Sequence, residues 1–455
     1  MRRRWVDGGL VALLVLVGTA LRFYELESVP PRLSADEYTT ALDVFEINAG
    51  KGPPLFGLDW KPMPALTSHL TAVLVRVTGP SILGLRLLSI VLSLVAALLL
   101  FVLLRWTCSP GVAFAAALSL LANPWFLNFS RSGWENAHVA AYWLAFSWCF
   151  FSGLRAERWA AVRFVAAGVA LALSCYGYFT GRLLVAAWLL FLPVAAAVVR
   201  RSWRRVLGGY AITAATAVVL FAPQIPVLVR DWDGFQRRVS NVSLLNADPA
   251  DQGYAPGTSR TAMAADQLWR TVRYLTVGLE IGKVHYSPSA RPPLHPILIP
   301  FLLLGLVAAA IHWRDGLWWW LLLGVSVTVT QALSVGAPDL ARLVVVCPIL
   351  FWFIGYGAEV AVGWLPERLR SGATAALAVG ALLLTLAEWR YFESWMLSDG
   401  VTVTRGGGVD YREYARWQTM QADRLARGRP PLPVVEWERP EVRQAVLDGR
   451  ADALP

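Results

Sequence analysis

Long apolar stretches, separated by short arginine-rich loops, run along most of the chain. A helix needs about 20 mostly apolar residues to cross the hydrocarbon core of a bilayer. Stretches of about that length recur eleven times, at 8–25, 84–104, 111–128, 137–154, 161–179, 182–199, 206–226, 296–313, 316–335, 341–363 and 371–389. The pattern predicts an all-α polytopic membrane protein with about eleven transmembrane helices.

Composition agrees with this fold class. Of 455 residues, 56% are hydrophobic and 16% are charged, which leaves too little polar surface for a soluble globule of this size. The four cysteines lie in or beside apolar stretches without metal-ligand spacing, so we expect them to pack against apolar neighbours.

The distribution of arginine predicts how the chain is oriented, because short loops rich in Arg and Lys stay cytoplasmic. With a cytoplasmic N-terminus, every second loop carries arginine, as in 2–4, 155–163 and 200–205. The other loops carry acids such as Asp36, Glu37 and Glu135, and are therefore expected outside. The net charge of +10 then reflects topology and contact with anionic lipid, and no nucleic-acid partner is expected.

Three regions lie outside the predicted bundle. Residues 1–389 are expected to form the transmembrane catalytic domain, with external loops at 26–83 and 227–295, followed by an external tail at 390–455. Two apolar stripes at helical spacing predict amphipathic helices in the first loop, and they consist of Leu42, Phe45 and Ala49, and of Leu66, Leu70, Val73 and Val77. The second loop is polar and contains Gly and Pro breakers, so we interpret it as a mobile lid.

Acidic residues gathered at one membrane face suggest a functional site, because carboxylates are costly near lipid. Ser34 and Glu37 have the spacing of a capping box, which gives Glu37 a structural role and places Asp36 in the first helical turn. Both acids could simply begin a surface helix. Glu135 on the same face favours a catalytic interpretation for Asp36 and Glu135, with Glu37 as a candidate substrate-binding residue.

Basic residues on this face are candidates for binding phosphate. Lys61 precedes the second amphipathic stripe, and Arg237 and Arg238 form a pair that could fork onto phosphate oxygens, although solvated surface charge is an equal alternative. Arg131 and Arg342 lie at outer helix ends against the topological trend, so they need local anionic partners, which for Arg342 could be the nearby Asp339.

Cofactor motifs are not evident. The sequence contains no P-loop, Rossmann fingerprint or GxSxG elbow, so no obligatory cofactor is expected. His69 and His138 could ligate a divalent cation together with an acid, but a hydrogen-bonded role is the better interpretation.

The order of these features resembles the GT-C glycosyltransferases. The chain is most similar to bacterial relatives of dolichyl-phosphate-mannose protein mannosyltransferases and of the aminoarabinose transferase of lipid A. An Asp-Glu pair in the first external loop, Lys61-Pro62, the helix entry at Arg86 and the later acid Glu135 are the main points of resemblance. Two departures are Thr39, where the lipid A enzyme has an arginine, and Glu135, where it has an aspartate.

The resemblance implies transfer of a sugar from a polyprenyl-phosphate donor at the outer face of a bacterial plasma membrane, to a glycan, lipid or protein. Asp36 would act as general base, with Glu135 orienting a substrate and Lys61 and Arg238 offsetting phosphate charge. The main alternative is a transporter or flippase of lipid-linked sugars, but transporters tend to show repeated halves and ionisable groups at the membrane midplane.

Overall fold

The computed structural model describes residues 2–30, 33–198, 203–278, 286, 291–312, 317–398, 401, 420, 424, 427–429 and 444–445. Within these residues the regular elements are helices, apart from two isolated β-bridges, Leu58 with Pro64 and Ser243 with Ser334. The all-α fold class is confirmed.

The apolar helices follow the hydropathy pattern closely. They are α1 (Arg2–Phe23), α4 (Ile82–Leu104), α5 (Pro110–Ala122), α6 (Pro124–Ser130), α7 (His138–Arg155), α8 (Ala160–Tyr176), α9 (Leu183–Val198), α10 (Trp203–Phe221), α14 (Ile299–Ile311), α15 (Trp318–Ala332), α16 (Leu340–Leu343), α17 (Cys347–Gly363) and α18 (Glu367–Met396). Each of the eleven apolar ranges falls on one or two of these helices.

The count of eleven spans is not confirmed. Among the described residues, six helices are long and apolar enough to cross a membrane, or seven if α5 and α6 form one span bent by 62°. Helices α8, α9, α14 and α15 have 13 to 17 residues. At 1.5 Å per residue they rise about 20–26 Å, which is less than the roughly 30 Å of the hydrocarbon core.

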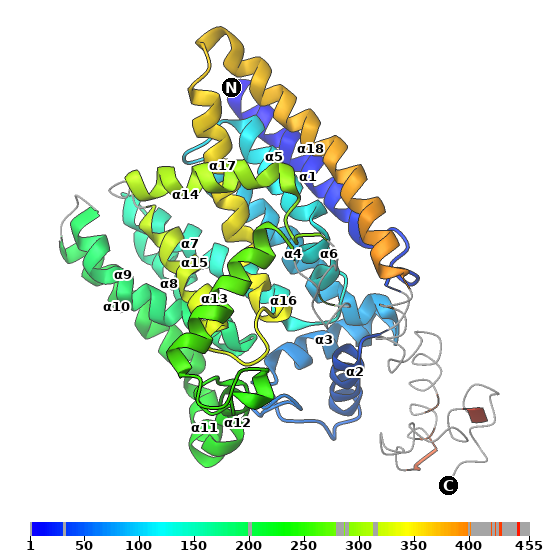
Figure 1. The fold of residues 1–455 in the computed structure, drawn as a ribbon. Coiled ribbons are helices and arrows are strands. Elements are labelled where there is room, and N and C mark those ends of the chain that lie inside the picture. Colours follow the sequence, from blue (N-terminus) through cyan, green and yellow to red (C-terminus); the bar gives the residue numbers. More distant parts are fainter. Residues whose placement is uncertain are drawn as a thin grey trace.

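Close packing holds the bundle together. Helices α14 and α17 cross where Gly305 faces Gly357, and a Cβ added to either glycine would lie 2.0 Å from a carbonyl oxygen of the other helix. Small residues allow helix backbones to approach this closely, as is typical of membrane helices. Helix α5 packs against α1, α17 and α18 (Figure 1). Three of the four cysteines are buried and all are free, which confirms the apolar packing expected for them.

The helices outside the bundle gather at one end. Helices α2 (Ala35–Asn48), α3 (Leu66–Thr78), α11 (Ile225–Arg230) and α12 (Trp232–Val242) lie together at the bottom of Figure 1. At the other end, where α4 and α7 finish, Arg105 pairs with Asp7 at 3.0 Å and Arg155 lies over the Trp106 ring.

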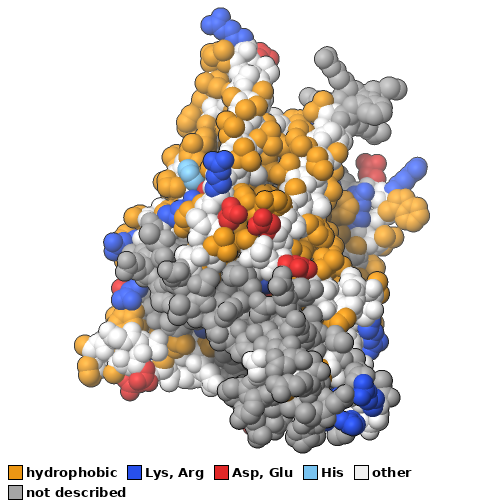
Figure 2. Space-filling model, turned by 90° about the vertical axis from the view of Figure 1, so that its right-hand side faces the viewer, with side chains coloured by type: hydrophobic (Ala, Val, Ile, Leu, Met, Phe, Trp, Pro, Cys, Tyr) orange, Lys and Arg blue, Asp and Glu red, His pale blue; other side chains and the backbone are white. Residues whose placement is uncertain are grey.

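The two expected amphipathic helices of the first loop are present as α2 and α3. The apolar stripe of α3 faces outward, since Val73 and Val77 are 54% and 80% exposed, while Ala72 and Val75 pack inward. An outward apolar stripe suits a helix that lies on a membrane surface. In Figure 2, hydrophobic side chains likewise cover much of the upper bundle.

The second loop is largely helical, and α18 extends into the region expected to be the tail. Between 225 and 276 the chain is largely helical, with α13 (Arg260–Thr276) following α11 and α12, so this part is not an open loop. Helix α18 continues to Met396, beyond the boundary expected at residue 389. Most of the tail lies outside the described residues.

Candidate active site

A polar cavity of about 290 Å³ lies at the end of the bundle where α2 begins. Its lining residues come from five separate segments and include Asp36, Lys61, Trp134, Tyr178 and Asn241. These segments are α2, the loop before α3, the turn after α6, the turn before α9 and α12. The structure therefore brings two of the expected site residues, Asp36 and Lys61, to one cavity.

The start of α2 presents Asp36 to this cavity. Both hydrogen bonds of the expected capping box are present, between the Ser34 hydroxyl and the Glu37 N–H and between the Ser34 N–H and the Glu37 carboxylate. Asp36 thus lies in the first turn, where the helix dipole favours its negative charge. Its Oδ2 accepts a hydrogen bond of 3.1 Å from the Tyr286 hydroxyl.

Glu37, which the sequence suggested as a substrate contact, is enclosed by protein. It is 2% exposed, and its Oε1 accepts hydrogen bonds from Arg86 Nε at 3.0 Å and from the Gly133 N–H at 2.8 Å. One carboxylate therefore connects α2, α4 and the turn after α6. This geometry favours a role for Glu37 in positioning Asp36.

Lys61 and Glu135 form a close ion pair beside the cavity. Lys61 Nζ lies 2.8 Å from Glu135 Oε1, and the two side chains are 9% and 6% exposed. The Lys61 ammonium also lies 4.9 Å and 5.0 Å from the ring centroids of Trp60 and Trp134. Because these contacts hold the ammonium on several sides, it is a fixed positive charge in the cavity wall.

Two further acids near this pair were not among the sequence candidates. Asp59 Oδ1 accepts hydrogen bonds from the Lys61 and Met63 N–H groups at 2.8 and 2.9 Å, and Asp43 Oδ2 accepts one from the Trp60 N–H. Burial raises the pKa of Asp59 to about 7 and that of Asp43 to about 6. Asp43 follows Asp36 by seven residues on the same helix face, which was an available signal.

Asp59→Asn is expected to flatten the pH dependence of stability. In the unfolded chain the carboxyl has its ordinary pKa of 3.8. Between that pH and about 7, Asp59 is therefore protonated in the folded protein and ionised in the unfolded chain. The contribution of Asp59 to stability therefore falls as pH rises from about 4 to about 7. An asparagine oxygen can still accept both N–H groups, so Tm should exceed that of the wild type at pH 8 and match it more closely at pH 5.

Thermal unfolding in detergent between pH 4 and 8 measures this effect. Asp231→Asn, at the cap of α12, is the matched control because the same chemical change there involves an exposed carboxylate. If Asp59→Asn keeps the pH slope of the wild type, the carboxylate is not held protonated by burial.

Arg131 does not reach the polar cavity. It is fully buried, and its guanidinium lies over the rings of Trp389 and Phe392. It donates hydrogen bonds to the backbone carbonyls of Leu21, Tyr24, Glu25 and Val29. Carbonyl oxygens at the end of α1 therefore replace the anionic partner expected from the sequence, and Arg131 ties α1 to α6 and α18.

The other expected basic residues lie elsewhere. Arg342 donates to the Val335 carbonyl at 2.9 Å and lies 3.6 Å from Asp339, as its spacing suggested, and it lines a second, adjacent cavity. The side chains of Arg237 and Arg238 lie outside the described part of the structure.

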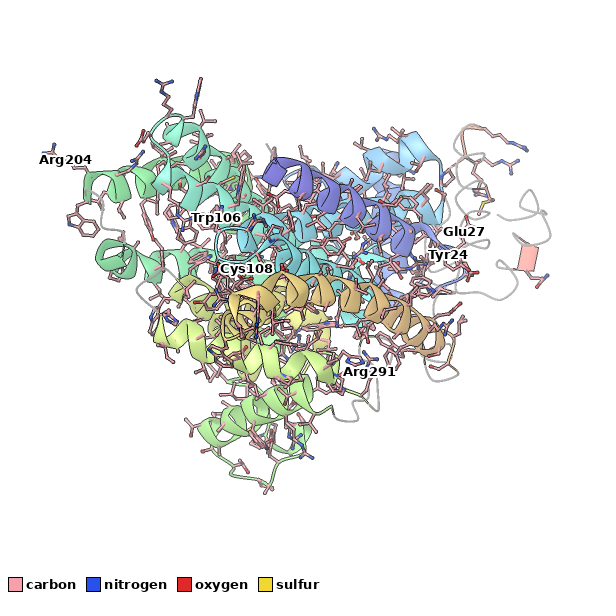
Figure 3. All side chains as sticks on the ribbon, turned by 90° about the horizontal axis from the view of Figure 1, so that it is seen from above. Tyr24, Glu27, Trp106, Cys108, Arg204 and Arg291 are labelled. Carbon is pink, nitrogen blue, oxygen red and sulfur yellow. The ribbon has the colours of Figure 1, made fainter. Side chains whose placement is uncertain are left out.

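Tyr286 is the site residue that sequence reasoning missed entirely. Besides bonding Asp36, its ring lies 5.0 Å from that of Trp134. Five residues later, Arg291 donates to both oxygens of Glu388 on α18 at 2.7 Å (Figure 3). This ion pair joins Arg291 to α18, a contact between residues 97 apart that no local pattern reveals.

No group of three or more His, Cys, Asp or Glu side chains is arranged to hold a metal ion within the described residues. His69 Nε2 lies 2.9 Å from the Pro53 carbonyl, and His138 Nε2 lies 2.8 Å from the Ser89 hydroxyl. Both histidines are therefore hydrogen-bonded.

Sequence comparison shows which known proteins this chain is similar to. Residues 62–226 match the family described as dolichyl-phosphate-mannose-protein mannosyltransferase. A search of curated protein sequences finds no match. The matched stretch includes Glu135 and begins directly after Lys61.

Two solved structures share the fold of this chain. The oligosaccharyltransferase of Archaeoglobus fulgidus, in the apo form, has a TM-score of 0.61 and 12% identity, and the match covers 99% of this chain and 60% of that one. ArnT of Cupriavidus metallidurans, bound to undecaprenyl phosphate, has a TM-score of 0.56 and 15% identity, with 92% and 80% covered.

The chain has the same fold as these two enzymes, and the family match over residues 62–226 confirms the resemblance seen in the sequence. Over residues 62–226 the chain is similar to the mannosyltransferase family, and in fold it is similar to ArnT. It spans 60% of the length of the archaeal enzyme.

Proposed function

We propose that this protein is an integral-membrane glycosyltransferase. It transfers a sugar from a polyprenyl-phosphate donor to an acceptor hydroxyl, with inversion, at the extracytoplasmic face. The observation that carries the proposal is the Asp36 carboxylate, which lines a polar cavity together with a fixed ammonium at the end of a GT-C-like bundle.

Asp36 acts as the general base in the proposed reaction. It accepts the proton of the acceptor hydroxyl while that oxygen bonds to the anomeric carbon. The bond from the anomeric carbon to the phosphate oxygen breaks on the opposite side, and its electron pair leaves with the polyprenyl phosphate. Asp36 lines the polar cavity, so an acceptor hydroxyl placed there can reach its carboxylate, while the Tyr286 hydroxyl donates to Oδ2.

The leaving phosphate gains negative charge as the bond breaks, and cations near the cavity offset it. Lys61 provides one positive charge, and Glu135 holds its ammonium in place at 2.8 Å. The arginine-rich loops at the other end of the bundle favour the extracytoplasmic side for this cavity.

The fate of the donor tests the proposal. Purified protein in proteoliposomes is incubated with polyprenyl-phosphate sugars labelled in the sugar, together with cell-envelope extract as acceptor. A transferase releases free polyprenyl phosphate and labels the acceptor. A flippase moves the label across the bilayer and leaves the sugar–phosphate bond intact, and that result would overturn the proposal.

A further inference from the structure

A second cavity, of about 220 Å³, adjoins the polar one and contains two guanidinium groups. Tyr178 and Phe179 line both cavities, so one short turn separates them. Arg182, at the end of the 3₁₀ turn Phe179–Arg182, and Arg342 line the second cavity. The apolar side chains of Leu183, Val239, Val242 and Val327 form part of the remaining wall, and Thr180, Thr330, Gln331 and Ser334 complete it.

Aromatic rings hold the Arg182 guanidinium in place. Its central carbon lies 4.0 Å from the ring centroid of Phe235 on α12 and 4.9 Å from that of Phe179. Contacts of this kind use the flat faces of a guanidinium and leave the N–H groups at its edge to donate hydrogen bonds.

The Arg182 guanidinium lacks an anionic partner among the described residues. Its Nη2 is buried from solvent and has no hydrogen-bond partner there. Buried charged donors are normally paired, so an unpaired one beside a cavity points to an anionic ligand. Arg342 differs, since the Val335 carbonyl and Asp339 partly satisfy it.

Lys61 differs from Arg182 in having an anionic partner. Its ammonium is already paired with Glu135 at 2.8 Å, so an arriving phosphate must compete with a carboxylate for it. Arg182 has no such competitor within the described structure, and its planar fork matches two oxygens of a phosphate.

We propose that the second cavity binds the lipid phosphate of the donor, with Arg182 as its main phosphate ligand and Arg342 as a second cation. This inference rests on the proposed function. The apolar wall receives the first prenyl units, and the shared turn at Tyr178 and Phe179 places the phosphate next to the cavity of Asp36 and Lys61. An anion next to an apolar wall fits a prenyl phosphate better than free phosphate.

Binding of farnesyl phosphate to the full chain in detergent tests the proposal without any sugar or acceptor. Farnesol and inorganic phosphate serve as separate probes for the tail and the head. Arg182→Gln is expected to weaken binding of farnesyl phosphate about 10- to 100-fold, as for loss of a charged hydrogen bond. Arg182→Lys keeps the positive charge but loses the planar guanidinium, so its affinity for farnesyl phosphate should lie between those of the wild type and Arg182→Gln.

Arg155→Gln is the matched control. Its guanidinium also lies over an aromatic ring, that of Trp106 at 4.4 Å, but at the other end of the bundle. It should bind farnesyl phosphate as the wild type does. Thermal unfolding of each variant verifies that the fold is intact.

Three outcomes would overturn the inference. They are unchanged binding in Arg182→Gln, equal affinity of the wild type for farnesol and farnesyl phosphate, and equal affinity for inorganic phosphate. Because the assay contains no sugar, failure of the proposed transfer reaction would leave Arg182-dependent binding intact, so the two proposals fail separately.

Discussion

Asp36→Asn is expected to reduce sugar transfer by about 10²- to 10⁴-fold, the usual contribution of a general base. Asparagine has the shape of aspartate and can still accept the hydrogen bond from Tyr286, but it cannot take a proton from the acceptor. The loss should therefore appear in kcat, with donor binding and Tm close to those of the wild type. Initial rates with saturating labelled donor measure it.

Glu46→Gln is the control for loss of a negative charge on the same helix, because Glu46 is exposed on α2, away from the lining of the cavity. Its transfer rate should stay within about twofold of the wild type, as for a surface change. A folded Asp36→Asn protein that transfers sugar at the wild-type rate would exclude Asp36 as the base.

Much of the fold could be read from the sequence because hydropathy and helix caps are local properties. Every apolar range became helical, and the Ser34 capping box formed as its spacing indicated. The number of spans could not be read, since neighbouring helices decide whether a short helix such as α14 crosses the bilayer or ends within it. Hydropathy also could not show that 225–276 is mainly helical, because those helices have polar faces.

The candidate site was only partly predictable, because charged residues are visible in a sequence but contacts between distant residues are not. Asp36, Lys61 and Glu135 were chosen from charge and sidedness, and in the structure Asp36 and Lys61 line one cavity while Glu135 pairs with Lys61. Tyr286 and Arg182 matter because of partners distant in sequence, and a single tyrosine or arginine in a membrane protein carries no such information. Sidedness also made Arg131 a phosphate candidate, whereas in the structure its guanidinium donates hydrogen bonds to backbone carbonyls.

Glu37→Ala is expected to destabilise the protein by about 3–5 kcal/mol, as for removal of one partner of a buried ion pair. It leaves the fully buried Arg86 without its carboxylate and removes the acceptor of the Gly133 N–H. Gly133 also approaches the Leu85 carbonyl so closely that a Cβ there would lie 3.0 Å away, so this turn has little freedom to compensate. Thermal unfolding in detergent should show a large fall in Tm.

Asp7→Asn is the matched control, because it breaks the ion pair between Asp7 and Arg105. The Asp7 and Arg105 side chains are 35% and 22% exposed, so the loss of stability should be no more than about 1 kcal/mol. Glu37→Gln separates the two roles suggested for this residue. If Glu37 positions Asp36, stability and transfer should fall together, since the turn that carries Trp134 and Glu135 loses its anchor. If Glu37→Gln instead keeps the wild-type Tm and loses transfer, Glu37 contacts substrate and its enclosure in this structure does not represent the working enzyme.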